Sequence, residues 1–565
     1  MLKYKLNINA MGRFLLTQRI IFILIAVAFI IRIPTLFVRY FDPDEFEHLH
    51  AARNIYLGMV PYKDYFEHHT PFFHFFLASL NIFLKDKIEL FFLARFVMLI
   101  FTCGILYLTH RIAKLLHGVN VALYAVVFLS YVKMFNEKTI EIRPDVPGVI
   151  FWLLSLFFFI TGIIREKQYP HNRRRYFFLA GIMMASAILT TQKAIFCMIG
   201  LLMAWTYMQF DKRIGLTLRE GFDSLAWFGL GLSVPFSVTC AYFLLNNALG
   251  EFIYRNFIMN LYWKERFLPY EYILQIIKQN TFFSVFGLAG MIIVVFHLCQ
   301  KGKILKGRFV LLFSLLVLIA GLFLIRIPYR QYYLFLFPLL AIYSGFIFDI
   351  IIRYFSWKQL RKFWLKQKYL YFYFLSVLFA AILITTSYII GWSKLFTLTV
   401  RDIPNFYLWI GLFLTPFLIW SFINGRRQYF ALVLMMGIIV YPFKLMLDDF
   451  LSKDFHLKYS NKAKLDEIRF VLQNTSLDDT VFDSWSGSGV FRNHAYYYWF
   501  LHNEIQKMLT IKERSDNILN ALKAKRPKIV IYDSFTQLLP LQVKSYITKN
   551  YRPAGIGDIY ILKYQ

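Results

Sequence analysis

The sequence has few charged residues and few cysteines. Only 17% of its 565 residues are charged and 58% are hydrophobic, whereas about a quarter of a soluble protein is charged. The four cysteines all lie inside apolar runs, so they do not form the disulfide framework of a small secreted protein or a cysteine-rich metal cluster. This balance excludes an ordinary soluble domain and indicates an integral membrane protein.

The sequence also lacks the common nucleotide and zinc motifs. It contains no Walker-type GxxxxGK, no GxGxxG and no HExxH, which argues against ATP-driven transport and zinc proteolysis. Its net charge of +30 comes largely from Lys and Arg in short gaps between apolar runs, where they set topology and contact anionic headgroups. We therefore expect membrane lipids as partners, and no nucleic acid.

The long apolar runs predict about 13 transmembrane helices, because a helix needs roughly 20 mostly apolar residues to cross the bilayer. The predicted spans lie near residues 17–38, 88–109, 119–135, 146–164, 175–191, 192–210, 222–246, 281–299, 308–325, 331–352, 369–390, 405–423 and 428–447. Alternate gaps hold about 26 Lys and Arg in roughly 80 residues, against about 16 in roughly 115 residues of the other gaps. This asymmetry predicts a cytoplasmic N-terminus and an extracytoplasmic C-terminus.

The composition changes after about residue 448. AKLDEIRFVLQN and DNILNALKAKR are typical of amphipathic helices, while TVFDS, KIVIYDS and IYILKY are typical of short strands. The sequence thus predicts a polytopic α-helical domain over residues 1–447 and a small extracytoplasmic α/β domain over 448–565.

An acidic, histidine-rich stretch occupies the first extracytoplasmic loop, residues 39–87. It contains Asp42, Asp44, Glu45, Glu47, His48, His50, Asp64, Glu67, His68 and His69. Helical spacing predicts an amphipathic helix on the membrane surface from Glu45 to Gly58, with Asp44 at its N-terminus. Asp44 can then be a helix cap or a general base that takes a proton from an acceptor hydroxyl.

The histidines of this loop raise the possibility of a divalent metal site. His48 and His50 are two residues apart and face different ways on a helix, and the adjacent His68 and His69 are awkward as joint ligands. We expect hydrogen bonding to substrate instead. No cofactor is required by the sequence, and metal dependence stays open.

Polar residues at other predicted span ends complete the candidate site. Asp145 follows Arg143 in EIRPDVPG, where the pair can cap a helix or bind sugar hydroxyls and a phosphate. Lys193 and Arg330 can extend to headgroups or bind the phosphate of a lipid-linked donor, with Tyr333 and its neighbours Tyr329 and Tyr332 beside them.

The order of these motifs resembles the GT-C membrane glycosyltransferases, with protein O-mannosyltransferases and lipid A aminoarabinose transferases as the nearest branch. The resemblance rests on Asp44-Glu45 after the first span, the stretch from Tyr62 to Pro71, and the Arg-Pro-Asp ending at Asp145. It implies transfer of a sugar from a polyprenyl-phosphate donor to a lipid, glycan or protein hydroxyl, with inversion, at the outer face of the bacterial inner membrane.

The same resemblance implies residue roles. Asp44 corresponds to the family's first-loop catalytic aspartate, Glu45 completes the Asp-Glu pair, and Asp145 corresponds to a later aspartate. The aminoarabinose branch has a Glu-Lys-Pro-Pro motif, and the corresponding stretch of this chain starts at Glu67 and continues with His68. The expected lysine is therefore absent, and His69 is the candidate phosphate contact. Two alternatives remain: a transporter or flippase of lipid-linked sugars, and an envelope-polysaccharide polymerase or ligase.

Overall fold

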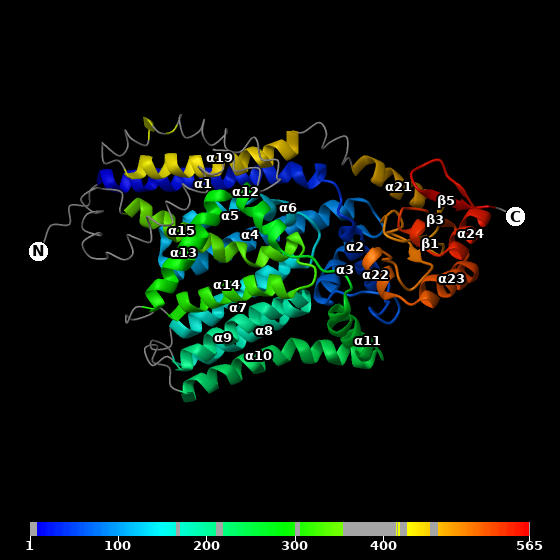
Figure 1. The fold of residues 1–565 in the computed structure, drawn as a ribbon, viewed down its shortest axis with the longest axis horizontal. Helices are drawn as coiled ribbons and strands as arrows, with labels where there is room; N and C mark the ends of the chain where they lie inside the picture. Colours follow the sequence, from blue (N-terminus) through cyan, green and yellow to red (C-terminus); the bar gives the residue numbers. More distant parts are fainter. Residues whose placement is uncertain are drawn as a thin grey trace, which may run out of the picture.

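The protein has a bundle of long helices with a small α/β lobe at one end (Figure 1). The computed structural model describes residues 8–164, 170–210, 218–299, 306–353, 414, 416–417, 427–451 and 461–563. The helices of the bundle are α1 (Ile8–Val38), α4 (Glu89–His117), the shorter α5 (Val119–Ser130), α7 (Asp145–Ile164), α8 (Pro170–Thr190), α9 (Ile195–Phe210), α10 (Leu218–Leu245), α13 (Thr281–Cys299), α14 (Lys306–Leu324), α15 (Phe337–Arg353) and α19 (Arg427–Leu451).

Seven helices in the described part of the chain are long and apolar enough to cross a membrane, or eight if the bent pair α12 (Tyr270–Gln279) and α13 forms one span. The chain is therefore an integral membrane protein. The predicted span 369–390 and nearly all of 405–423 lie outside the described residues, so the total of 13 stays a prediction. The predicted span 119–135 is not one continuous helix, because the short helix α5 ends at Ser130 and a second helix, α6 (Lys133–Lys138), begins three residues later.

Glycines let neighbouring helices of the bundle approach closely. A Cβ atom on Gly181 of α8 would overlap the backbone carbonyl of Phe228 in α10, and one on Gly231 of α10 would overlap that of Phe178. Small residues at such crossings allow backbone-to-backbone packing in a membrane, where lipid offers no hydrophobic driving force for association.

We therefore expect Gly181→Ala to destabilise the protein by about 1–3 kcal/mol, the usual cost of overpacking. A lower midpoint of thermal unfolding in detergent would show it. Gly229→Ala is the matched control, because nothing lies within 4 Å of a Cβ atom at this position of α10. Equal midpoints for the two variants would contradict the packing argument.

Several shorter elements lie between the long helices. They are α2 (Pro43–Tyr56), α3 (Phe72–Leu84), α6 (Lys133–Lys138), η1 (Gln192–Ala194), α11 (Leu249–Ile253), η2 (Tyr254–Ile258), η3 (Met259–Tyr262) and η4 (Arg330–Phe335). Among them, α2, α3 and α11 lie at the end of the bundle beside the lobe (Figure 1).

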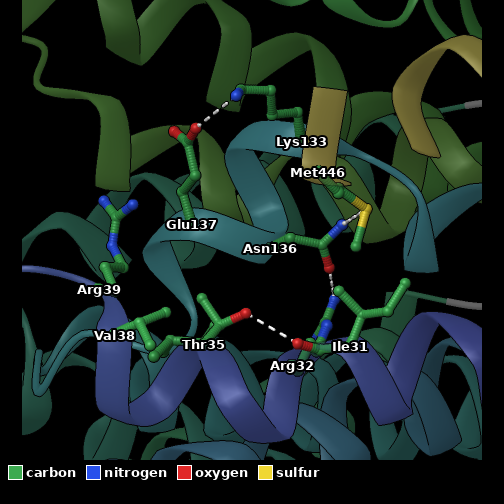
Figure 2. A pocket seen from close by; sticks show the side chains of 10 residues that line it. Ile31, Arg32, Thr35, Val38, Arg39, Lys133, Asn136, Glu137 and Met446 are labelled. Carbon is green, nitrogen blue, oxygen red and sulfur yellow. Dashed lines mark hydrogen bonds and ion pairs between the residues drawn. The ribbon is translucent and has the colours of Figure 1, made fainter. Parts of the chain in front are cut away.

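Polar contacts join the first helix to α6 and α19 around a cavity of about 40 Å³ (Figure 2). The buried Arg32 of α1 donates to the side-chain oxygen of Asn136, and its guanidinium lies 5.2 Å from the ring centroid of Phe135. Asn136 in turn contacts Met446 of α19. These contacts hold α1 in the position from which the chain enters the acidic loop.

The lobe is a five-stranded mixed sheet with helices, as its sequence pattern predicts. Its strands are β1 (Thr480–Asp483), β2 (Asn493–His494), β3 (Ile529–Ile531), β4 (Tyr551–Pro553) and β5 (Ile559–Leu562), in the order β2-β1-β3-β5-β4. β1 pairs in parallel with β2 and β3, and β5 is antiparallel to β3 and β4. Its remaining elements are α21 (Asn461–Asn474), α22 (Asn503–Met508), η6 (Glu513–Asn517), α23 (Ile518–Lys525), η7 (Thr536–Leu538) and α24 (Leu541–Asn550).

Candidate active site

The helix of the acidic loop, α2, begins earlier than the sequence pattern predicts. Its N-cap is Asp42, not Asp44: the Asp42 side chain accepts from the Asp44 amide, while Glu45 accepts from the Asp42 amide. This capping box, together with Pro43 at the first turn, fixes the start of the helix. Asp44 is thereby released from the capping role and carries a side chain free for other contacts.

The helix is also buried, which corrects the expectation of a membrane-surface helix. Ten of its residues, Glu45 to Asn54, are buried. Imidazole Nδ1 of His50 lies 2.9 Å from the Val490 carbonyl of the lobe, and its ring stacks on Trp499. The hydrophobic periodicity predicted the helix. It could not show that the lobe, which lies more than 400 residues further along the chain, covers the polar side of the helix.

Arg143, in the segment between α6 and α7, binds three carboxylates. Its guanidinium lies 2.5 Å from Asp44, 2.7 Å from Asp42 and 2.5 Å from Glu141. Asp44 has the most exposed side chain of the three, at 29%, against 16% for Asp42 and none for Glu141. Arg143 thus orients Asp44 while one side of that carboxylate stays accessible.

Electrostatics keeps Asp44 ionised. Burial on its own raises the pKa of Asp44, but the adjacent guanidinium of Arg143 outweighs burial and lowers the pKa below its ordinary value. The Glu47 carboxyl on the same helix has its pKa raised by burial and then by Glu67. The pKa values of these two neighbouring carboxyl groups are therefore shifted in opposite directions, as in sites that separate acid and base roles.

Asp145 pairs with Lys193, not with Arg143 as the local sequence suggested. The Lys193 ammonium lies 3.0 Å from Asp145 and 3.7 Å from the ring centroid of Tyr332. Lys193 is in η1, immediately before the span formed by α9, and its side chain points to protein groups. The sequence left open whether Lys193 extends to lipid headgroups; in the structure it contacts Asp145 and Tyr332 instead.

These groups line one cavity of about 830 Å³ between the bundle and the lobe. Its size is that of a site for a small molecule or part of a larger one. Six of the residues selected from the sequence line it: Asp44, His69, Arg143, Asp145, Lys193 and Arg330. His48, which the sequence raised as a possible metal ligand, lines the cavity as well.

Three other candidates lie away from the cavity lining. Glu45 is fully buried and pairs with Arg95 of α4 at 2.6 Å. Tyr333 is buried and donates its hydroxyl to the Pro269 carbonyl. His50 contacts the lobe, as described above. Their contacts indicate that they position other elements.

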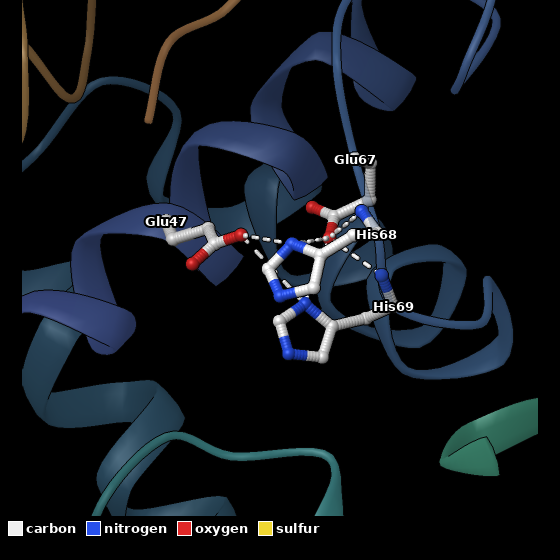
Figure 3. Close-up of side chains that lie close together, drawn as sticks. All are labelled: Glu47, Glu67, His68 and His69. Atoms are coloured by element: carbon white, nitrogen blue, oxygen red, sulfur yellow. Dashed lines mark hydrogen bonds and ion pairs between the residues drawn. The ribbon is translucent and has the colours of Figure 1, made fainter. Parts of the chain in front are cut away.

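The described residues include one group of side chains with the spacing of a metal site, and it differs from the pair His48 and His50. It comprises Glu47, Glu67, His68 and His69, whose ligand atoms all lie within 4.8 Å of one another (Figure 3). His48 instead lies with its Nδ1 3.0 Å from Nε2 of His74. Burial lowers the pKa of His68 and lowers that of His69 to about 3, so both rings are neutral.

Part of the cavity wall comes from the lobe and from the segment before α12, and no sequence pattern predicted this contribution. Trp485, His502 and Glu504 of the lobe line the cavity with Trp263, whose ring stacks on that of His502. His502 lies 2.5 Å from Glu504. No local motif marks these residues, because they reach the cavity only through long-range docking of the lobe.

Comparison with known proteins identifies relatives of this architecture. Residues 68–243 match the family model described as dolichyl-phosphate-mannose-protein mannosyltransferase. The structure of ArnT from Cupriavidus metallidurans bound to undecaprenyl phosphate superposes with a TM-score of 0.61 at 12% identity, covering 96% of this chain and 97% of that chain. No curated protein matches the chain by sequence.

A second group of similar structures is archaeal. The apo oligosaccharyltransferase of Archaeoglobus fulgidus superposes with a TM-score of 0.55 at 11% identity, covering 90% of this chain and 69% of that chain. AglB from the same organism, in complex with an inhibitory peptide and a dolichol-phosphate, gives a TM-score of 0.53 at 12% identity, covering 91% and 69% of the two chains. The shared feature is the membrane fold.

Proposed function

Because the chain has the fold of the GT-C superfamily that includes the protein mannosyltransferases and ArnT, we propose that it is a glycosyltransferase that uses a polyprenyl-phosphate-linked sugar. The acceptor is a hydroxyl group of a lipid, glycan or protein. The observation that carries this proposal is that the accessible carboxylate of Asp44 lines the same cavity as the cations Lys193 and Arg330.

The acceptor half of the reaction takes place at Asp44. The ionised carboxylate accepts the proton of the acceptor hydroxyl while the hydroxyl oxygen attacks the anomeric carbon of the sugar. Arg143 holds the carboxylate and Asp145 lies on the same cavity wall, where it can accept hydrogen bonds from sugar hydroxyls. A single displacement of this kind inverts the anomeric configuration.

The donor half of the reaction takes place at the cations. The bond between the anomeric carbon and the phosphate oxygen breaks, and the polyprenyl phosphate leaves with the electron pair. Lys193 and Arg330 line the cavity where this negative charge develops, and fixed positive charges stabilise such a leaving group. His69 can donate a hydrogen bond to the same phosphate.

The cavity is expected to open on the extracytoplasmic side of a bacterial plasma membrane. The sequence asymmetry of Lys and Arg predicts a cytoplasmic N-terminus. The arrangement of the chain agrees with this, because α1 begins at the end of the bundle far from the lobe (Figure 1), and residues of the lobe line the cavity. The lobe then faces acceptors outside the cytoplasm.

The test is a transfer assay with the full chain in proteoliposomes. Radiolabelled polyprenyl-phosphate sugars are supplied with extracted envelope lipids, glycans or proteins, and the label is followed into acceptors. We expect labelled acceptor and released polyprenyl phosphate in equal amounts. Movement of labelled donor across the bilayer without transfer would instead support the flippase alternative, and elongating glycan products would support a polymerase.

Lys193 offers a specific check on the donor contact. We expect Lys193→Gln to lower turnover about 100-fold, in the range for loss of one electrostatic contact to developing charge. Glutamine can still donate to Asp145, so the buried carboxylate keeps a partner. Lys63→Gln is the control, since that exposed lysine donates only to the Asn246 carbonyl in the described structure. Equal turnover of both variants would remove Lys193 from the mechanism.

A further inference from the structure

Two carboxylates and two imidazoles converge where the segment that precedes α3 meets α2. Figure 3 shows Glu47 on α2 on one side of the His68 and His69 rings and Glu67 on the other. The Glu67 carboxylate is buried, and Glu47, His68 and His69 line the cavity. The residues therefore form a partly enclosed pocket of nitrogen and oxygen ligands in the wall of the main cavity.

The distances between these ligand atoms lie within about 0.5 Å of those in tetrahedral zinc coordination. Nδ1 of His68 lies 3.4 Å from Oε1 of Glu47 and 3.9 Å from Oε1 of Glu67. Nδ1 of His69 lies 3.7 Å and 2.8 Å from the same two oxygens. Ligands bound tetrahedrally at zinc distances of 2.0–2.2 Å are separated by about 3.3–3.6 Å, so small shifts would bring all four to one ion.

Charge and hydrogen bonding also indicate a cation at this position. Nδ1 of His68 is buried among these groups and makes no hydrogen bond, although a buried nitrogen normally has a partner. Glu47 and Glu67 place two buried carboxyl groups within reach of the same position, where a bound cation would favour the ionised form of both. A divalent ion with two carboxylates and two neutral imidazoles gives a site with no net charge.

Neighbouring groups would hold the ligands in position. The backbone amides of His68 and His69 both donate to Oε1 of Glu67, and Nε2 of His74 lies 3.6 Å from Oε2 of the same carboxylate. Partners of this kind orient metal ligands in known sites. The mixture of imidazole and carboxylate favours zinc or a similar first-row ion over Mg²⁺ or Ca²⁺, which prefer oxygen ligands alone.

We propose that Glu47, Glu67, His68 and His69 form a binding site for one Zn²⁺-like transition-metal ion. The ion joins the segment that precedes α3 to α2 and fixes one wall of the cavity. This site is additional to the proposed transfer chemistry, which needs no metal in any of its steps. The adjacent histidines, unsuitable as joint ligands on a helix, can both contribute here because they lie in a non-helical segment before α3.

The test measures metal binding directly. Full-length protein in detergent, freed of any affinity tag, is treated with a chelator, titrated with Zn²⁺ or Co²⁺ and separated from unbound metal. We expect one zinc per chain by elemental analysis, and for Co²⁺ the strong visible absorption of tetrahedral coordination. We expect Glu67→Gln and His68→Gln each to lower zinc affinity by more than about 100-fold, since even second-sphere changes cost 10–100-fold.

His110→Gln provides the control, because this half-buried histidine of α4 lies outside the cluster. Wild-type protein without stoichiometric zinc would overturn the proposal, whatever the variants do. Zinc affinity unchanged in both variants would overturn it as well. If either variant fails to fold, Glu47→Gln replaces it. Since no turnover is measured, failure of this site leaves the glycosyltransferase proposal unaffected, and the transfer assay leaves the metal proposal unaffected.

Discussion

Replacement of Asp44 by asparagine is expected to lower sugar transfer by about 10²–10⁴-fold, the usual contribution of a positioned general base. Asparagine has nearly the same shape and can still accept a hydrogen bond from Arg143, but it cannot take a proton from the acceptor. Arg143 keeps its ion pairs with Asp42 and Glu141, so the surrounding structure is expected to persist. Initial rates in proteoliposomes, at matched protein content, give the measurement.

Asp64→Asn is the matched control for this prediction. Asp64 belongs to the same acidic loop, but its carboxylate accepts from the Val60 amide and does not line the cavity. We expect its transfer rate to stay within about twofold of the wild-type rate, as for a surface change of less than 0.5 kcal/mol. An Asp44→Asn protein that folds and transfers sugar at the control's rate would exclude Asp44 as the base.

The second large effect is expected from Glu45, through stability. Glu45 and Arg95 are both fully buried, and Arg95 also donates to the carbonyls of Leu36, Arg39 and Tyr40 at the end of α1. Removing one partner of a buried ion pair costs about 3–5 kcal/mol, because the other charge is left without compensation. We therefore expect Glu45→Gln to lower the midpoint of thermal unfolding strongly.

A double-mutant cycle separates this effect from catalysis. The double variant Glu45→Gln with Arg95→Gln removes both charges. We expect its loss of stability to be smaller than the sum of the losses in the two single variants. Glu89→Gln, at an exposed position in the first turn of α4, serves as the control and should change stability little. A folded Glu45→Gln protein of wild-type stability and impaired turnover would assign Glu45 a direct chemical role.

Much of the fold was accessible from the sequence because it depends on local patterns. Apolar runs located the long helices, and alternating residues located β1, β3 and β5 in the lobe. The two shortest strands, β2 and β4, carry too few residues to form a pattern. The bend of 110° between α12 and α13 also depends on neighbouring helices, which no local window contains.

The candidate site divides in the same way. Asp44, Arg143 and Asp145 were selected because they lie at the ends of predicted spans and match the ordered motifs of the GT-C glycosyltransferases. Their pairing was not predictable: Arg143 is two residues from Asp145 yet binds Asp44, nearly a hundred residues earlier. Trp485 and His502 were missed because aromatic and histidine residues in a polar lobe are common, and only docking brings them to the cavity.

The position of α2 between the bundle and the lobe also bears on biosynthesis. The cavity is lined by residues between positions 42 and 69, and also by Trp485, His502 and Phe535 of the lobe. Ribosomal synthesis thus delivers the two halves of the site at opposite ends of elongation, and the membrane helices insert between them. Until the lobe, residues 461–563, has been synthesised, the His50 ring has no Trp499 to stack upon. The cavity is thus completed late in folding, and we expect the proposed transfer activity to appear only after the lobe has docked.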